Sequence, residues 1–420
     1  MSETDDLESA LLLAAADADA RNTISEQEEV EEEETYKEFK EESPEPEVQP
    51  EPAPPVERWE NAKLRKTNEG FAKVVANHYN QLEEKGLEER SKSRIVHLRN
   101  FHNWIKSMLI NEYLTKIKNV KYNEPIHVLD MGCGKGGDLF KWQKGSIKHL
   151  ICTDIAEISL DQCKQRYTDM ARRNNRGRNG DIFSIEYIPA DCTRKRLREK
   201  YKDPSMQLNL VSCQFVFHYS FESLPQAEKM FQNAAECLKP GGYFIGTLPD
   251  SNDIIARAQR NRTRTFGNDL LKVSLDFDPD DPPLFGAKYH FQLDGVVDCP
   301  EFLVHFPTLV KLAKRYGLKL ERKEKFYDYY ERMKEEGDHL LRNMRTFESY
   351  PPAEGCSLVG TAEDDYAHAD AYLKATGQQG PLGTLSKSEW EASSLYLTFV
   401  FVKVKPSAYN KDGRPIYDIK

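Results

Sequence analysis

The sequence lacks the cysteine patterns of a structural zinc site or of a disulfide framework. Its 420 residues include eight cysteines, but no C-x-x-C pair and no cluster of histidines. We therefore expect reduced thiols and no bound metal. Cys133 stands inside a glycine-rich stretch. There it is either a reactive thiol or a small residue that the turn tolerates.

Long hydrophobic runs are also absent. No apolar stretch approaches the roughly 20 residues of a membrane-spanning helix. The short apolar run at 11–16 follows acidic residues and has no basic segment before it, unlike a secretory signal. These absences predict a soluble intracellular protein with no membrane partner.

Negative charge is concentrated at one end of the chain. Residues 1–57 contain 20 Asp and Glu but three Lys and Arg, a net charge of −17. The remaining residues therefore carry 56 basic against 49 acidic side chains, a net charge of +7. A basic domain attracts phosphates, while an acidic segment either reduces non-specific nucleic-acid binding, recruits a partner or is merely solvated.

Composition also predicts three regions. Residues 1–57 are rich in Glu and Pro and poor in apolar residues, so we expect an acidic, disordered N-terminal tail. A folded domain is expected over 58–404, with an insertion at about 265–300 and a mobile loop at about 346–385. Residues 405–420 are expected to form a C-terminal tail without an assigned function.

The most informative segment reads VLDMGCGKGGD over residues 128–138. A buried strand is predicted to enter a glycine-rich turn there. Glycines at alternate positions (Gly132, Gly134 and Gly136) let the backbone adopt positive φ and approach a ligand closely. Asp154 ends the next apolar strand, where a carboxylate can accept both hydroxyls of an adenosine ribose. The segment therefore predicts a nucleotide cofactor site.

Two cofactors fit the turn, because Gly132, Gly134 and Gly137 also satisfy the dinucleotide fingerprint of NAD enzymes. Asp130 directly precedes the turn and would repel a pyrophosphate. Asp191 follows a strand expected at 183–188, in position to meet an adenine amino group. The join LKPGG at 238–242 resembles the one before the fifth strand of Rossmann-like methyltransferases. These features favour S-adenosylmethionine. A dehydrogenase and a purely structural glycine turn are the alternatives.

Strands and helices alternate along the chain, as a parallel sheet with right-handed crossovers requires. We expect an α/β fold with a Rossmann-like seven-stranded methyltransferase sheet, helices on both faces and a small β-containing insertion. A helix is expected from about Glu301. The seven strands are expected at 126–130, 149–153, 183–188, 208–214, 243–248, 318–326 and 395–404.

Several further motifs occur in a recognisable order over roughly residues 70–404. They read RNFHNWIK at 99–106, LDMGCGKGGD at 129–138, SCQFVFHYSF at 212–221, GVVDCPEF at 295–302 and PLGTLS at 381–386. Together they resemble the eukaryotic mRNA cap guanine-N7 methyltransferases, which are class I, S-adenosylmethionine-dependent enzymes. The resemblance implies methyl transfer to N7 of the guanosine that caps nascent mRNA.

The resemblance also implies roles for individual residues. His102 occupies a position where the family usually has an asparagine, so its role is open. The cofactor-binding residues would be Lys106, Gly132, Asp154, Asp191, Gln214 and Tyr219. The cap-binding residues would be His102, Asn103, Lys135, Lys141, Arg166, His218, Glu301 and Tyr396.

The chemistry of these residue types suits a guanosine cap. Lys135, Lys141 and Arg166 offer three cations to a 5′-5′ triphosphate. Glu301 can accept hydrogen bonds from guanine N1–H and the exocyclic amine. An aromatic ring can stack on the base, either Tyr396 or, in the insertion, Tyr289 or Phe291. The alternatives are a solvated Lys141, a core histidine at His218 and a helix first-turn residue at Glu301.

No dedicated general base is expected, because guanine N7 carries an unprotonated lone pair at neutral pH. The leaving group departs as a neutral thioether from an activated sulfonium. Rate should therefore come from in-line positioning of the reacting atoms by His218, Glu301 and Tyr219.

Two other functions fit the motifs less completely. The first is another RNA or small-molecule S-adenosylmethionine-dependent methyltransferase, and the second is a non-catalytic cap-binding protein. The family also implies a nuclear enzyme that works beside the transcription and capping machinery and, in animals, with a small activating subunit.

Overall fold

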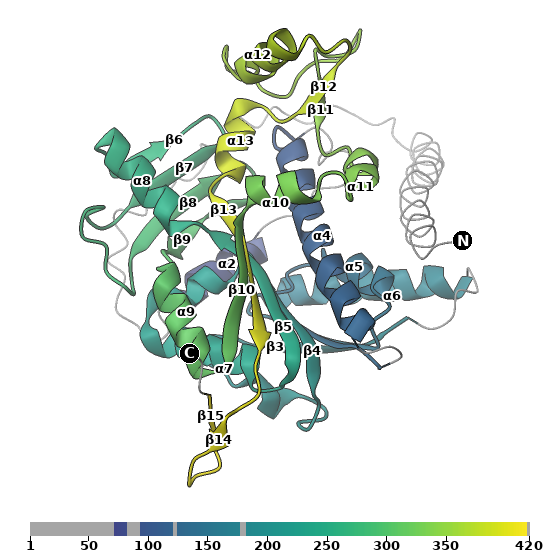
Figure 1. The fold of residues 1–420 in the computed structure, drawn as a ribbon, viewed down its shortest axis with the longest axis vertical. Coiled ribbons are helices and arrows are strands. Elements are labelled where there is room, and N and C mark those ends of the chain that lie inside the picture. Colours follow the sequence, from purple (N-terminus) through teal and green to yellow (C-terminus); the bar gives the residue numbers. More distant parts are fainter. Residues whose placement is uncertain (1–70, 82–92, 121–123, 177–181, 418–420) are drawn as a thin grey trace, which may run out of the picture. The chain divides into compact units, whose positions relative to one another are not determined.

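The computed structural model describes residues 71–81, 93–120, 124–176 and 182–417 (Figure 1). The expected acidic tail at 1–57 lies outside these residues. All the described elements belong to one compact unit, Phe71–Lys420. Among the described helices, none has the length and apolarity that crossing a bilayer requires.

A seven-stranded mixed sheet forms the centre of this unit, which confirms the expected fold class. Its order is β10-β13-β5-β4-β1-β2-β3. Strands β1 to β5 are mutually parallel, and β13 runs antiparallel between β5 and β10. The strands are β1 (His127–Met131), β2 (His149–Asp154), β3 (Ser184–Pro189), β4 (Leu208–Gln214), β5 (Leu238–Pro249), β10 (Leu318–Lys325) and β13 (Tyr396–Lys403).

Side chains alternate strictly between the two faces of the sheet, and both faces are buried. In β1, Val128 belongs to one hydrophobic core and its neighbour Leu129 to the other, as the two-residue period of a strand requires. On the first face lie α4 (Val96–Val120), α5 (Leu139–Lys144) and α6 (Glu157–Arg176). The second face is covered by α7 (Leu224–Ala235) and α9 (Phe306–Arg315).

The strand order reverses beside β1, because β2 pairs with one of its edges and β4 with the other. At such a switch point, the connections that follow the two neighbouring strands run to opposite faces of the sheet. A crevice therefore opens beyond the carboxyl ends of these strands. The glycine turn follows β1, and Gln214 is the last residue of β4. The topology alone therefore brings these two segments to one place.

A second, antiparallel sheet occupies the region where the insertion was expected. Its strands follow in chain order: β6 (Thr265–Gly267), β7 (Leu271–Leu275), β8 (Lys288–Leu293) and β9 (Val297–Phe302). Helix α8 (Ser251–Asn261) precedes this sheet and lies beside it (Figure 1).

The expectation of a helix from about Glu301 is wrong. Glu301 lies in β9, opposite Tyr289 of β8, and helix α9 begins at Phe306. Pro300 is compatible with β9 because this strand is at the edge of its sheet, where a missing N–H costs least. Pro307 occupies the first turn of α9 instead, where it lacks only an N–H that would have no helical partner.

The expected loop at 346–385 contains regular structure, namely β11 (Glu348–Tyr350), α12 (Ala367–Thr376) and β12 (Leu382–Thr384). Gly377 ends α12 with a φ of 63°, the left-handed C-terminal cap that glycine adopts most easily. The C-terminal tail forms a hairpin of β14 (Ala408–Tyr409) and β15 (Pro415–Ile416).

Six further short elements complete the described fold. They are α2 (Ala72–Gln81), α10 (Phe326–Met333), α11 (Asp338–Asn343), α13 (Lys387–Ser393), and the 3₁₀ helices η2 (Leu197–Lys200) and η3 (Phe217–Glu222). Helix α13 anchors α4 through one carboxylate. Glu389 accepts from the Leu98 N–H at 2.9 Å and from the backbone N–H of Ser386 at 3.1 Å. Ser386 and Glu389 together form a capping box at the start of α13.

Replacing Ser386 by alanine removes the side-chain acceptor of this cap. We expect Ser386→Ala to lower the free energy of unfolding by about 1 to 2 kcal/mol, measured by urea denaturation. Thr376→Ala is the matched control, because its hydroxyl lies in the exposed last turn of α12, where it donates to the Tyr372 carbonyl and accepts a long 3.4 Å bond from the Gln378 N–H. Equal losses in the two variants would contradict the anchoring role of the cap.

Candidate functional site

The glycine turn after β1 has the backbone that its sequence predicts. Gly132, Gly134 and Gly136 have φ angles of 74°, 52° and 75°. A Cβ added to Gly132 would lie 2.4 Å from a methyl carbon of Val216, so no larger residue fits there. The N–H groups of Gly132 and Cys133 both donate to the Thr153 carbonyl, at 2.8 and 3.1 Å. The turn is therefore fastened to the end of β2.

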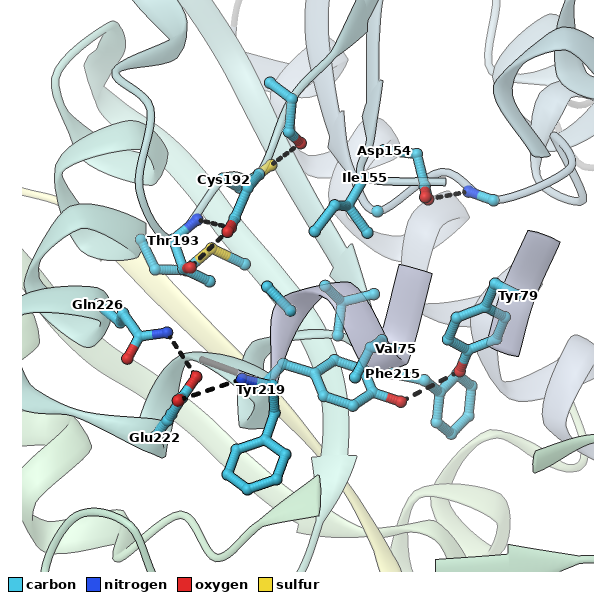
Figure 2. Close-up of a pocket in the computed structure, with 18 of the residues that line it drawn as sticks. Val75, Tyr79, Asp154, Ile155, Cys192, Thr193, Phe215, Tyr219, Glu222 and Gln226 are labelled. Atoms are coloured by element: carbon cyan, nitrogen blue, oxygen red, sulfur yellow. Dashed lines mark hydrogen bonds between the residues drawn. The ribbon is translucent and has the colours of Figure 1, made fainter. Parts of the chain in front are cut away.

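Asp154 completes this fastening. Its Oδ2 accepts from the Gly134 N–H (Figure 2) and its Oδ1 from the Ala156 N–H, each at 2.8 Å. Burial raises the pKa of Asp154, although these N–H donors oppose the rise. Each carboxylate oxygen retains a second lone pair, so the side chain can still accept from ligand hydroxyls.

A cavity of about 270 Å³ opens over the turn. Five of the six predicted cofactor residues line it: Gly132, Asp154, Asp191, Gln214 and Tyr219. Gln214 donates to the Ser212 hydroxyl at 3.0 Å, but its buried Oε1 has no hydrogen-bond partner among the described residues. An unpaired buried carbonyl is costly. It fits a ligand that carries N–H donors, as S-adenosylmethionine does.

Asp191 lies at the cavity wall but is already engaged. Its Oδ1 accepts from the backbone N–H and the hydroxyl of Thr193, at 2.8 and 2.6 Å, and its Oδ2 lies 3.3 Å from Arg194 Nε. Cys192 and Thr193, the next two residues, also line the cavity. Sequence reasoning named only the carboxylate and missed these two.

Helix α2 was missed altogether. Phe71, Val75 and Tyr79 lie on the cavity wall, and the Tyr79 hydroxyl is 3.1 Å from that of Tyr219 (Figure 2). Their spacing of four residues is a helix period. The apolar pattern could therefore have predicted a helical face, but not what that face would cover.

Lys106 lies outside the cavity wall, in a partly buried charge cluster with Asn103, Asp138 and Lys141. Asp138 Oδ1 is 2.8 Å from both Lys106 Nζ and Lys141 Nζ, and Lys141 also donates to Asn103 Oδ1 at 2.6 Å. Burial alone would raise the pKa of Asp138, but the two ammonium groups hold it well below its usual range. Burial lowers the pKa of Lys141.

A second buried group joins His218 and Glu301. Their Nε2 and Oε1 atoms are 3.4 Å apart, and Glu301 Oε2 accepts from the Tyr289 hydroxyl at 2.6 Å. His218 is 2% exposed and Glu301 4%. Neither ring nitrogen of His218 makes a hydrogen bond within the described residues. Such a pair has polar capacity left for a ligand.

Aromatic rings surround His102, another of the predicted cap-binding residues. His102 stacks on Phe215, with ring centroids 5.5 Å apart, and meets Tyr396 edge-on at 5.1 Å. Burial and nearby Lys106 lower the pKa of His102 to about 3, so its ring is neutral near pH 7. Phe215 adopts a φ of 59°. Such backbone strain is concentrated at functional sites.

Lys135 and Arg166 complete the predicted set. Lys135 belongs to the glycine turn, Arg166 to α6, and both are half-buried. Neither lines the cavity. The structure therefore divides the predicted residues among the cofactor cavity, the Asp138 charge cluster, the His218–Glu301 pair, the aromatic group and these two cations.

Comparison with known proteins identifies the family. The mRNA (guanine-N(7))-methyltransferase domain matches residues 62–404. The chain belongs to this family. The mRNA cap guanine-N(7) methyltransferase of Drosophila melanogaster is 52% identical over 348 residues, covering 82% of this chain and 80% of that protein. The Caenorhabditis elegans enzyme of the same name is 40% identical over 352 residues, covering 81% and 89%.

A solved S-adenosylmethionine-dependent methyltransferase from Clostridium acetobutylicum ATCC 824 is also similar. Its TM-score is 0.38 at 11% identity, covering 70% of this chain and 90% of that chain. The family confirms the sequence resemblance and the expected methyltransferase class, with S-adenosylmethionine as cofactor. A dehydrogenase is thereby excluded.

Gly132→Ala tests the fit of the turn. Because the new Cβ would meet Val216 and the φ is positive, we expect affinity for S-adenosylhomocysteine to fall roughly tenfold or more, measured by calorimetry. Gly137→Ala is the control, since a Cβ there has no heavy atom within 4 Å. Unchanged affinity in a folded Gly132→Ala protein would contradict the assigned cofactor position.

Proposed function

We propose that the cavity and the groups around it bind S-adenosylmethionine and the guanosine cap of mRNA side by side. The chain is an mRNA (guanine-N7)-methyltransferase. What remains to assign is the task of each residue. One arrangement carries the assignment. The Gln214 carbonyl faces the cavity without a hydrogen-bond partner among the described residues, and the buried His218–Glu301 pair has ring nitrogens that likewise make no hydrogen bond there.

The cofactor half uses the carboxyl ends of the parallel strands. Asp154 accepts the ribose hydroxyls while it holds Gly134, and Gln214 accepts from an N–H of the cofactor. Lys106 binds the cofactor carboxylate, because an ammonium group has three N–H donors and can hold Asp138 at the same time. When bound, S-adenosylmethionine supplies a methyl group activated by its sulfonium sulfur.

Glu301 recognises the guanine base. Its carboxylate is kept in place by the Tyr289 hydroxyl and can accept from guanine N1–H and the exocyclic amine. This pair of donors distinguishes guanine from adenine, since adenine N1 is an acceptor. His218 orients the base through its ring nitrogens, which make no hydrogen bond among the described residues. Tyr396 and Phe215 provide an aromatic wall.

The triphosphate meets Lys135, Lys141 and Arg166. Asp138 neutralises only one of the two ammonium groups that it contacts, so its cluster keeps one positive charge. Asn103 holds Lys141 in place. His102 is neutral and enclosed by rings, so it acts by shape and not as a phosphate-binding cation.

Methyl transfer then needs alignment and no acid or base. Guanine N7 would supply the free lone pair, and the bound cofactor would supply the methyl group and take the electron pair of the broken carbon–sulfur bond as a neutral thioether. Holding N7, the methyl carbon and sulfur in line lowers the barrier by roughly 7 to 11 kcal/mol in well-oriented systems. Tyr219 bounds this path from the cofactor side, beside His218 in the chain.

The assay that decides the reaction follows labelled methyl from S-adenosylmethionine into three RNAs. They end in an unmethylated guanosine cap, a 5′ triphosphate or an N7-methylated cap. We expect label only on the first. Label on uncapped RNA would indicate another RNA methyltransferase. Cap binding without transfer would indicate a non-catalytic cap-binding protein or a missing partner subunit.

His218→Ala tests positioning against acid–base catalysis. We expect kcat/KM to fall by up to about 100-fold, the scale of a 1 Å misplacement, while the pH–rate profile keeps its shape. His305→Ala is the control, because that exposed ring contacts only Thr308 among the hydrogen-bond partners described. Loss of an ionisation from the His218→Ala profile would overturn the mechanism.

The setting of the reaction is also part of the proposal. A cap methyltransferase acts in mRNA processing, so a nuclear location beside the transcription and capping machinery follows from the substrate. A small activating subunit is also part of what the family resemblance implies. Activity of the purified chain alone in the labelled-methyl assay measures how far it depends on such a partner.

A further inference from the structure

Three thiols from separate elements of the fold lie close together beside the glycine turn. Cys133 lies in the turn, Cys152 in β2 and Cys163 in α6, and their sulfurs all lie within 4.8 Å of one another. Cys152 and Cys163 are 1% and 0% exposed, whereas Cys133 is half-buried. Within the described residues, no other group of three histidine, cysteine or acidic side chains is this compact.

This geometry is close to that of a three-sulfur metal site. Zn²⁺ binds thiolate sulfur at about 2.3 Å, so tetrahedral ligation places two sulfurs about 3.8 Å apart. The observed sulfurs need to approach by at most about an ångström to reach that spacing. Three sulfur ligands select soft ions over Mg²⁺ or Ca²⁺, and the half-buried Cys133 gives the ion a path from solvent.

We propose that Cys133, Cys152 and Cys163 form a three-sulfur site for one thiophilic metal ion of the Zn²⁺ class, and that an ion there weakens cofactor binding. The site departs from the expectation of no metal, which rested on the missing C-x-x-C spacing. Here β2 and α6 supply the ligands from positions 19 and 30 residues beyond Cys133, so no short motif marks the site.

The coupling follows from where the sulfurs are attached. Cys133 stands between Gly132 and Gly134, which both line the cofactor cavity. A Cβ on Gly136 would lie 2.8 Å from the Cys163 sulfur, so the cluster also contacts the far end of the turn. Drawing the sulfurs together therefore shifts the backbone that the cofactor needs in place. By linkage, bound cofactor weakens ion binding by the same factor.

The first experiment tests the site without using activity. The reduced, chelator-treated full chain is titrated with Cd²⁺, whose sulfur-to-metal absorption reports thiolate ligation, and bound Cd²⁺ is then displaced with Zn²⁺. We expect one ion per chain and at least a tenfold loss of affinity in Cys133→Ala, Cys152→Ala and Cys163→Ala. Absence of the absorption in folded protein would overturn the site.

Cys237→Ala is the matched control, because Cys237 is equally buried but lies outside the cluster. We expect Cys237→Ala to bind Cd²⁺ with the same affinity as the unmodified chain. Cys152→Ala or Cys163→Ala could fail to fold, which circular dichroism would show. In that case Cys133→Ala tests the site, because the side chain of Cys133 is only half-buried. Unchanged Cd²⁺ affinity in that variant overturns the proposal.

The second experiment tests the coupling, which rests on the proposed cofactor site. S-adenosylhomocysteine is titrated calorimetrically with and without one equivalent of Zn²⁺. We expect at least tenfold weaker binding with Zn²⁺, and no effect of Zn²⁺ in Cys163→Ala. Equal affinity with and without bound Zn²⁺ overturns the coupling. Absence of binding in the metal-free protein would instead overturn the proposed cofactor site.

Discussion

The contact between the glycine turn and the end of β2 is the constraint on which the rest of the site depends. Gly132 and Cys133 donate to the Thr153 carbonyl, and Gly134 donates to Asp154. The turn can approach β2 this closely because its glycines take positive φ and lack a Cβ. The cofactor cavity, the Asp138 charge cluster and the thiol cluster all border this turn. The position of its backbone therefore affects all three.

Buried charge around the turn is tolerated because it is paired. Asp138 lies between Lys106 and Lys141, which keep it ionised. Asp130, one strand residue before the turn, has a raised pKa because it is buried and faces the charge of Asp138. An unpaired second carboxylate would cost several kcal/mol there. The same geometry leaves one net positive charge toward the side where phosphate binding is proposed.

Sequence reasoning succeeded where a local pattern has one physical solution. The seven strands and the glycine turn follow from alternation and from positive φ, and Asp154 ends β2 as expected. It failed at Glu301, because a proline followed by an acidic residue suits both a helix start and an edge strand, and only pairing with β8 decides between them. It also missed α2 and α12, since a short amphipathic pattern does not say what it will cover.

By itself the sequence determined the fold class, the family and the kinds of chemical group that the site requires, because periodicity and motif spacing are local properties of the chain. Only the tertiary structure decided which groups meet. It paired Glu301 with His218 and Tyr289, enclosed His102 in aromatic rings, and gathered Cys133, Cys152 and Cys163. Such contacts join residues far apart in the chain, and their distances depend on how sheet and helices pack, which no local pattern encodes.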